Sequence, residues 1–309
     1  MRVFVIGGTG FLGGFLVPKL IQSRHSVTVL TRSAEKASGL EKRGITSLVG
    51  DLLQPDSFLP GLPPQDVVIS IAGPEMIKPQ RMTRKRFLGL RENTTKFFKT
   101  AIAAAEKLNC PLVATLGTSF RTKGDEVADE TRPIERFGVQ KIGELVDPLL
   151  NDVIKRGTPP LIRMLPGQIY GPGGMFMTMM FKMMRQGKSR TIGSGENRMP
   201  RVHVEDCAAA YLKVLEKMPV GESFIVADDS QCTTREFMDF MAECAKAPRT
   251  KPVPGFVIRL VMGRQLYETV TMNCRVSNAK LKRLGWVLKY PTYKEGLPPT
   301  IAGLEKIYG

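Results

Sequence analysis

The chain has 309 residues, 42% hydrophobic and 24% charged, and a formal net charge of +16. This composition is typical of a globular protein and excludes a disordered or fibrous chain. The five cysteines are scattered and never in Cys-x-x-Cys spacing, so we expect neither a disulfide framework nor a metal site. The positive charge favours anionic partners, namely nucleotides, phosphorylated substrates, nucleic acid or acidic membranes, without choosing among them.

Apolar runs in this chain are short. None approaches the roughly 18 residues that a membrane span needs, and because the first begins at Arg2 or Val3, we expect no signal or transit peptide. We therefore expect a cytoplasmic protein without a membrane span. The sequence leaves the oligomeric state open, a homodimer included.

A glycine-rich segment, Gly-Gly-Thr-Gly-Phe-Leu-Gly at residues 7–13, separates a predicted strand at Val3–Ile6 from a predicted helix. Glycines at 7, 10 and 13 permit a tight turn, close approach to a pyrophosphate and packing of the helix on its strand. The free N–H groups of the helix N-terminus suit the same phosphate. An ordinary strand-to-helix turn is the alternative. The segment predicts dinucleotide binding by these residues: Gly7, Thr9, Gly10, Phe11, Leu12 and Gly13.

The second predicted strand, residues 26–30, is followed by Thr31 and Arg32. At this strand end an acidic residue binds the ribose 2′-hydroxyl of NAD, whereas an arginine accommodates the 2′-phosphate of NADP. Because Arg32 is present and no carboxylate is, the sequence predicts NADP(H). A solvated loop arginine is the alternative interpretation.

Further strands are predicted at 46–49, 67–71 and 112–116, alternating with helical segments. This alternation predicts a doubly wound parallel α/β sheet. Ligands of such sheets bind beyond the carboxyl ends of the strands, which places Asp51, Ala72 and Gly73 near the adenosine and ribose. Asp51 alone could equally cap a helix.

Two segments have biased composition. Residues 78–86 carry five basic residues in nine, but without the interleaved aromatic residues of single-strand binders, so we do not expect nucleic-acid binding. Residues 175–184 hold six of the sixteen methionines and form either a pocket for a bulky apolar group or a helix packed on the core. Near the C-terminus, Thr233 and Glu236 predict a capping box, and residues 277–284 predict a short helix ended by Gly285.

Several landmarks resemble, in order, those of one family. They are the glycine motif, Gly50-Asp51-Leu52, Asn93-Thr94, Thr118-Ser119, residues 163–173, His203–Asp206, Ser277–Leu281 and Gly285-Trp286. Over nearly its whole length the chain resembles an extended short-chain dehydrogenase/reductase of the nucleotide-sugar epimerase/dehydratase type. The resemblance implies an NADP(H)-binding Rossmann domain, residues 1–166, and a smaller C-terminal substrate lobe, residues 167–309, between which the chain crosses more than once.

The resemblance also implies residue roles. Asp51 and Leu52 would flank adenine, and Lys141 would hold the nicotinamide ribose. Thr118 or Ser119 would hydrogen-bond the reacting oxygen. In the substrate lobe, Tyr170 would contact the substrate and Arg198 or Arg201 would bind its phosphates.

One position departs from the family pattern. Family members carry Tyr-x-x-x-Lys, in which the tyrosine exchanges a proton with the substrate, whereas this chain has Phe137 and Lys141, expected on one helix face. Loss of a positioned acid or base typically costs about 10²–10⁴ in rate. Phe137 is therefore an engineered substitution, a natural residue in an enzyme that takes its proton from Thr118, Ser119, Lys141, a substrate group or water, or the mark of a non-catalytic NADP(H)-binding regulatory or assembly protein. We favour an NADP(H)-dependent reductase or epimerase-like enzyme with an altered proton donor, acting on an anionic or bulky apolar small molecule.

Overall fold

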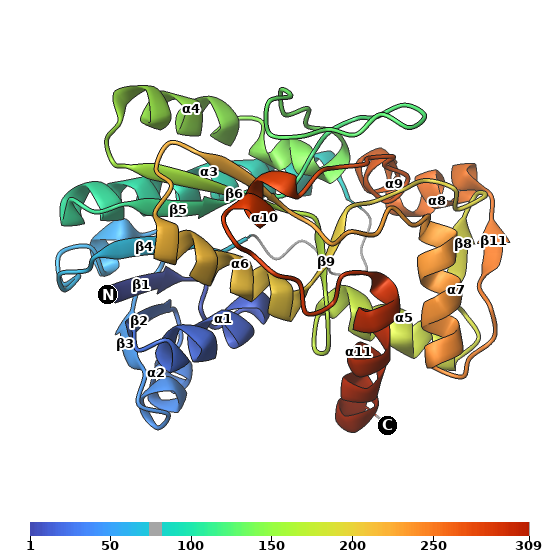
Figure 1. Ribbon diagram of the computed structural model, residues 1–309, viewed down its shortest axis with the longest axis horizontal. Coiled ribbons are helices and arrows are strands. Elements are labelled where there is room, and N and C mark those ends of the chain that lie inside the picture. The colour runs from blue at the N-terminus through green and yellow to red at the C-terminus, as the bar shows by residue number, and fades with distance from the viewer. Residues whose placement is uncertain (74–81, 309) are drawn as a thin grey trace.

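The computed structural model describes residues 1–73 and 82–308. At its centre lies a seven-stranded sheet whose neighbouring strands are all parallel (Figure 1). Its spatial order is β10 (Ser223–Val226), β6 (Leu161–Pro166), β5 (Leu112–Thr115), β4 (Val67–Ser70), β1 (Arg2–Ile6), β2 (Ser26–Thr31) and β3 (Thr46–Val49). The chain builds outward from β1 in one direction and then, from β4, in the other. The crevice at the carboxyl ends of β1 and β4 is thus a topological switch point, where ligands of such sheets bind.

Helices cover both faces of this sheet. On one side lie α1 (Phe11–Gln22), α2 (Ala34–Glu41) and α6 (Val204–Lys217), and on the other α3 (Arg84–Leu108) and α4 (Val146–Arg156), as Figure 1 shows below and above the sheet. In α1, Leu12, Leu16 and Leu20 recur every fourth residue and are buried against the strands. The predicted fold, a doubly wound Rossmann-type sheet, is confirmed.

The remaining elements form a second part of the molecule. Helices α5 (Met175–Arg185), α7 (Thr234–Cys244) and α11 (Tyr293–Tyr308) share one apolar core. Around them lie two short parallel strand pairs, β8 (Arg190–Ile192) with β11 (Lys251–Val253) and β7 (Gln168–Tyr170) with β9 (Arg201–His203). The other elements are η1 (Pro55–Ser57), η2 (Gly138–Gly143), α8 (Gly255–Met262), α9 (Arg264–Val270) and α10 (Ala279–Arg283). Since α6 and β10 return to the large sheet, the chain crosses between the two parts repeatedly.

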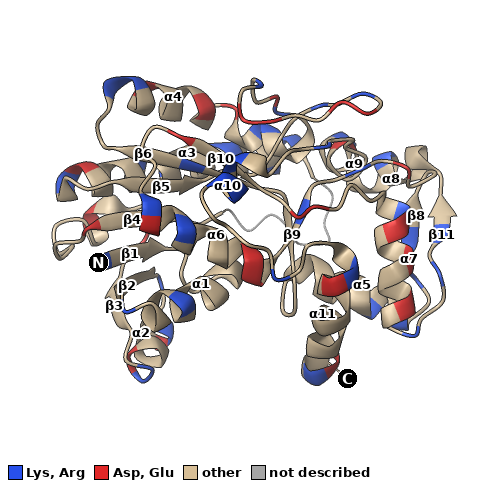
Figure 2. Ribbon diagram, viewed as in Figure 1, with Lys and Arg blue, Asp and Glu red and all other residues tan. Residues whose placement is uncertain are grey.

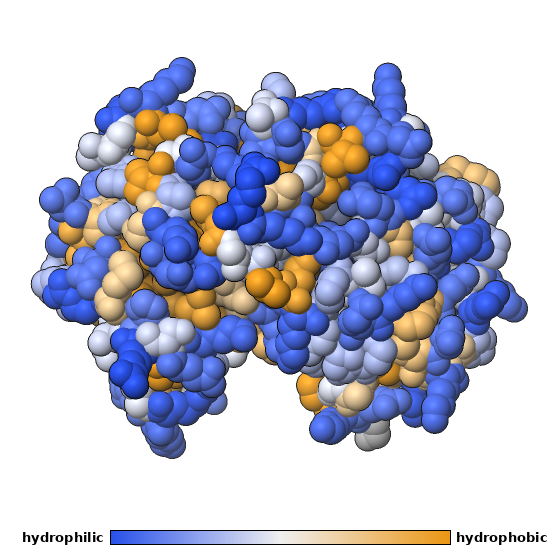
Figure 3. Space-filling view, in the orientation of Figure 1, coloured by the Kyte–Doolittle hydropathy of each residue, from blue (hydrophilic) through white to orange (hydrophobic). Residues whose placement is uncertain are grey.

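The surface shows the same two parts. In Figure 3 the outline is notched between the part that carries α2 and the part that carries α11, and hydrophilic residues cover most of this face. Lys and Arg outnumber Asp and Glu by 45 to 29, and Figure 2 shows them spread over both parts. Of the basic segment 78–86, residues 78–81 lie outside the described residues, and residues 84–86 form the first turn of α3.

Strand boundaries agree with the sequence to within one residue: β4 ends at Ser70 and β5 at Thr115, each one residue early. The predicted capping box of Thr233 and Glu236 is present at the start of α7. The methionine-rich helix α5 proves to be core packing, since Met177, Met180 and Met184 are buried. Among the helices described, none combines the length and apolar character required to cross a bilayer.

Candidate functional site

The glycine loop joins β1 to α1 at the switch point. Gly7 has φ +92°, and a Cβ there would lie 2.6 Å from the backbone nitrogen of Ala72, so the loop presses against the end of β4. A Cβ on Gly13 would collide with the backbone of Gly8. Gly10 is the N-cap of α1, and no side chain of the described residues caps this helix. Glycine is therefore required at two positions, and the helix N-terminus is left for an anion, which fits a dinucleotide pyrophosphate.

The remaining residues of this segment divide into surface and core. Thr9 is exposed, whereas Leu12 is buried among the strands. Phe11 is partly buried, and its ring packs edge-on against Phe15. A Cβ on Gly174 would lie 2.8 Å from Cζ of Phe11. The loop that opens the second part of the molecule therefore rests on the start of α1.

The predicted adenosine and ribose residues lie at the carboxyl ends of neighbouring strands. Arg32 follows β2 and is exposed, and none of the hydrogen bonds or ion pairs found within residues 1–73 and 82–308 involves its side chain. Asp51 accepts a hydrogen bond from the Leu53 amide at 2.9 Å and thus closes a local turn rather than capping a helix. Leu52 is buried, and its carbonyl accepts a hydrogen bond from Thr100. Gly73 follows Ala72 beyond β4 and is exposed.

The segment of Phe137 and Lys141 differs from the prediction. Instead of an α-helix it forms the 3₁₀ helix η2, with Phe137 as its extended N-cap and Gly138 at φ +56°. Because a 3₁₀ turn has three residues, positions 137 and 141 do not share one face, and the predicted common face is wrong. Phe137 is 3% exposed, and Lys141 is half-buried.

Long-range contacts explain this conformation. The amide of Gly138 donates to Glu268 at 3.2 Å, and that of Val139 donates to Thr269 at 2.8 Å, both on α9. A Cβ on Gly138 would lie 2.7 Å from the carbonyl oxygen of Gln265. Helix α9 therefore fixes η2 in a conformation that only glycine accommodates.

Thr118 and Ser119 follow β5 and are both buried. The Thr118 hydroxyl donates to the carbonyl of Leu165 at 2.5 Å, and the Ser119 hydroxyl donates to the carbonyl of Glu135. Each hydroxyl proton is thus held by the backbone. Both hydroxyl protons are engaged in this arrangement, and the expected hydrogen bond from one of the two residues to the reacting oxygen stays a prediction.

A cavity of about 360 Å³, here the Arg198 cavity, opens in the second part of the molecule. It is lined by Arg198, Ser230, Gln231, Cys232, Glu236, Thr292, Tyr293 and Lys294. Arg198 donates to the carbonyl of Gln231. Arg201 lies buried beside the cavity. A terminal nitrogen of its guanidinium is 3.7 Å from Cys232 Sγ, and its Cζ lies 4.2 Å from the centre of the Phe237 ring. Of the two predicted phosphate-binding arginines, therefore, Arg198 faces the cavity and Arg201 supports its wall.

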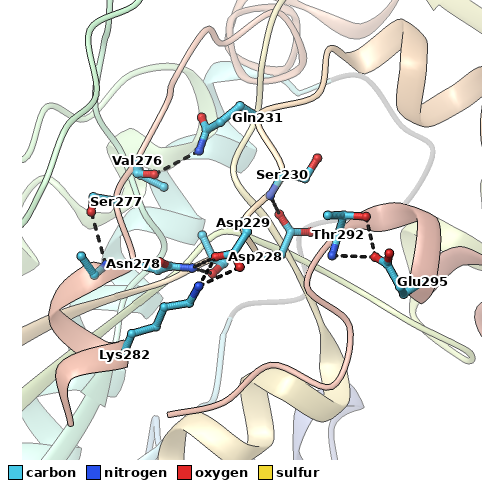
Figure 4. A network of polar contacts seen from close by, with 12 residues as sticks. Asp228, Asp229, Ser230, Gln231, Val276, Ser277, Asn278, Lys282, Thr292 and Glu295 are labelled. Atoms are coloured by element: carbon cyan, nitrogen blue, oxygen red, sulfur yellow. Dashed lines mark hydrogen bonds and ion pairs between the residues drawn. The ribbon is translucent and has the colours of Figure 1, made fainter. Parts of the chain in front are cut away.

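The wall of this cavity is braced by polar contacts (Figure 4). Asp229 accepts hydrogen bonds from Asn278 at 2.8 Å and from Lys282 at 2.6 Å, which ties the loop after β10 to α10. On the opposite rim, the Thr292 amide donates to Glu295 at 2.9 Å. The loop that supplies Ser230 and Gln231 is thus held in place.

Unpaired polar atoms gather beneath the cavity. The Tyr170 hydroxyl, Arg201 Nε, His203 Nε2 and Asp228 Oδ2 are buried and have no hydrogen-bond partner in the part of the chain that the structure describes. Tyr170 is fully buried and does not line the cavity, unlike the substrate contact expected of it. Burial raises the pKa of Asp228 to about 8 and lowers that of His203 to about 4. Burial thus favours the protonated form of Asp228 and the neutral form of His203.

Asp228 and the cavity residues Cys232 and Lys294 were missed from the sequence. A signal for Asp228 exists, because Asp228-Asp229 comes one residue after a buried strand. Lys294 offers none, since it reaches the cavity from a distant helix. Among the described residues, no three His, Cys, Asp or Glu side chains are placed to hold a metal ion.

Known proteins resemble this chain over most of its length. Residues 3–227 match the model of the NAD dependent epimerase/dehydratase family. Epimerase family protein SDR39U1 of Bos taurus is 27% identical over 316 aligned residues, which cover 98% of this chain and all of that protein. The crystal structure of human SDR39U1 with NADPH has a TM-score of 0.81 at 24% identity and covers 98% of this chain and 99% of that one. UDP-glucose 4-epimerase of Thermotoga maritima with UDP-glucose has a TM-score of 0.83 at 17% identity over the full length of both chains. The chain belongs to the NAD dependent epimerase/dehydratase family.

Proposed function

We propose that the chain binds NADP(H) through residues 7–13 and that Arg32 selects the 2′-phosphate. The observation that carries this proposal is the exposed Arg32 guanidinium at the end of β2, which lacks a described carboxylate partner. The crystal structure of the human relative with NADPH supports it. Asp51, Leu52, Ala72 and Gly73 belong to the same proposal as the adenosine and ribose contacts.

Titration calorimetry tests the cofactor proposal. Arg32→Glu should weaken NADPH binding by about tenfold or more, because it replaces a charge-assisted contact by repulsion, and should change NADH binding far less. Lys42→Glu makes the same charge change at the exposed end of α2 and should preserve the preference. Equal losses for both cofactors in Arg32→Glu would refute the assignment.

We further propose that the chain is an NADP(H)-dependent reductase or epimerase-like enzyme whose proton donor is not residue 137. When bound, the nicotinamide supplies hydride exchange. Arg198 and Lys294 give their cavity two cationic groups for an anionic substrate. Because Thr118 and Ser119 donate to the backbone, Lys141, a group of the substrate and water remain as candidate proton sources, and Lys141 is also the proposed contact to the nicotinamide ribose.

A second candidate is a non-catalytic NADP(H)-binding regulatory or assembly protein. Two observations favour it. The hydroxyls of Thr118 and Ser119 both donate to backbone carbonyls, and Phe137 places a buried phenyl ring without a hydroxyl in the same region. NADPH oxidation by the wild type, Phe137→Tyr and Lys141→Met over a substrate panel separates the two. Turnover by the wild type that Lys141→Met abolishes supports the enzyme. NADPH binding without turnover in all three proteins supports the non-catalytic protein, and turnover by Phe137→Tyr alone identifies residue 137 as the missing acid.

A further inference from the structure

A second cavity, of about 270 Å³, lies between α4, β6 and the segment 130–134. We call it the Arg163 cavity. It is lined by Phe120, Glu130, Arg132, Pro133, Ile134, Asp147, Asn151, Arg163, Leu165 and Ser223. It shares no lining residue with the Arg198 cavity and none with residues 7–13. Its volume is just below the range of drug-sized ligand pockets, so it suits a small molecule.

Arg163 at this cavity is a buried cation without a counter-ion. Arg163 lies within strand β6, which pairs with β5 on one side and with β10 on the other, and it is 5% exposed. Its terminal nitrogen donates to Asn151 Oδ1 at 2.8 Å, whereas its Nε is buried and has no hydrogen-bond partner among residues 1–73 and 82–308. No carboxylate of the described residues lies within ion-pair distance of it. Buried charges are ordinarily paired, so this guanidinium lacks an anion.

The carboxylates near this cavity are engaged elsewhere. Asp147 is held by Arg136 through two parallel hydrogen bonds of 2.8 and 2.9 Å. Glu130 accepts the Ile225 amide at 2.8 Å, and burial raises its pKa, which favours its neutral form. Arg132 pairs with Glu126 outside the cavity lining. The charge of Asp147 still favours the Arg163 cation, but both of its oxygens bond Arg136, so no carboxylate of the described residues bonds Arg163 directly.

We propose that the Arg163 cavity binds a small anion, a carboxylate or a phosphate, through the guanidinium of Arg163 beside the amide of Asn151. An occupant would also rest against Phe120 and Ile134, which pack in the same apolar cluster as Phe137. The Ser119 hydroxyl bonds Glu135 in the adjoining segment. The site is thus placed to respond to a small metabolite from outside the dinucleotide and substrate sites.

The test measures the thermal midpoint of the full chain against inorganic phosphate or acetate at constant ionic strength, with chloride as baseline. The key variant is Asn151→Asp, which places a carboxylate beside Arg163 at an exposed position of α4 and so replaces the anion internally. Lys155→Gln, one turn further along α4, makes the same charge change outside the cavity and is the matched control. Arg163→Gln removes the cation.

We expect phosphate or acetate to raise the midpoint of the wild type and of Lys155→Gln by about 2–4 °C at saturation. Asn151→Asp should start from a higher midpoint than Lys155→Gln and respond to neither anion. The anion with the larger effect identifies the ligand class. The proposal is overturned if neither anion exceeds chloride in the wild type, or if Asn151→Asp responds as the wild type does. Because Asn151→Asp alters only an exposed residue, the result stands even where Arg163→Gln does not fold.

Discussion

The guanidinium of Arg121 lies 4.3 Å from the centre of the Phe137 ring, so a cation covers the residue that we propose stands in place of the family tyrosine. The ring also packs in an apolar environment, since Phe137 belongs to a buried cluster with Phe120, Leu165 and Met272. A phenyl ring gains from both environments, because its face attracts a cation and its edge packs against apolar groups. Phe137 is therefore well suited to its surroundings as a structural residue.

This pair predicts a measurable coupling. Arg121→Gln should lower the free energy of unfolding by about 0.5–1 kcal/mol, because Arg121 is exposed and such contacts are weak at the surface. In a Phe137→Leu background the same change should cost almost nothing. Urea denaturation of the four proteins gives the coupling energy. Equal costs in both backgrounds would show that Arg121 acts independently of the ring.

The glycine loop gives a second prediction. Gly7→Ala should destabilise the protein by roughly 1–3 kcal/mol and abolish NADPH binding. Residue 7 has φ +92°, which alanine rarely adopts, and its Cβ would collide with the backbone of Ala72. Gly14→Ala is the control, since a Cβ there meets no atom of the described residues within 4 Å. That change should leave stability unchanged or slightly raised, as alanine favours a helix. Thermal unfolding and NADPH titration measure both effects, and similar losses in the two variants would contradict the account.

The elements that were predictable share one property, which is that local sequence determines them. The strands before β6 follow from short apolar runs, and the turn at Gly7–Gly13 follows from glycine spacing. The capping box at Thr233 needs only residues three apart.

The elements that were missed depend on distant residues. The conformation of η2 is set by Glu268 and Thr269, 130 residues away. The Thr118 hydroxyl is taken by the carbonyl of Leu165 on the neighbouring strand β6, a contact that the sequence does not indicate. Tyr170 is buried because α11 brings Gly296 against its hydroxyl, where only glycine leaves room. The sequence therefore predicted which residues gather at the sheet edge but not what their polar atoms bond.

A third prediction concerns the contact between η2 and α9. Gly138→Ala should cost roughly 1–3 kcal/mol more than Gly124→Ala, because both glycines have positive φ but only Gly138 is closely surrounded, with the Thr269 amide nitrogen 2.8 Å from its Cβ position. The penalty for the left-handed conformation is common to both and cancels in the comparison. Chemical denaturation gives the two values. A difference near zero would mean that α9 moves aside readily.

The last prediction follows from the buried Asp228 carboxyl. Its pKa is raised by burial to about 8 in the folded chain, against an ordinary value of 3.8, so the folded state holds a proton that the unfolded state releases between these values. Its favourable contribution is complete below about pH 4 and is lost as the pH rises toward 8, with a limiting slope of about 1.4 kcal/mol per pH unit.

Asp228→Asn keeps an acceptor for the Ser230 amide and removes the titration. The variant should therefore gain stability relative to the wild type as the pH is raised. Urea midpoints of both proteins across this range isolate Asp228, because all other groups titrate alike in the two. A difference that stays constant with pH would mean that the carboxyl is already ionised in the folded protein, compensated by the neighbouring Arg201.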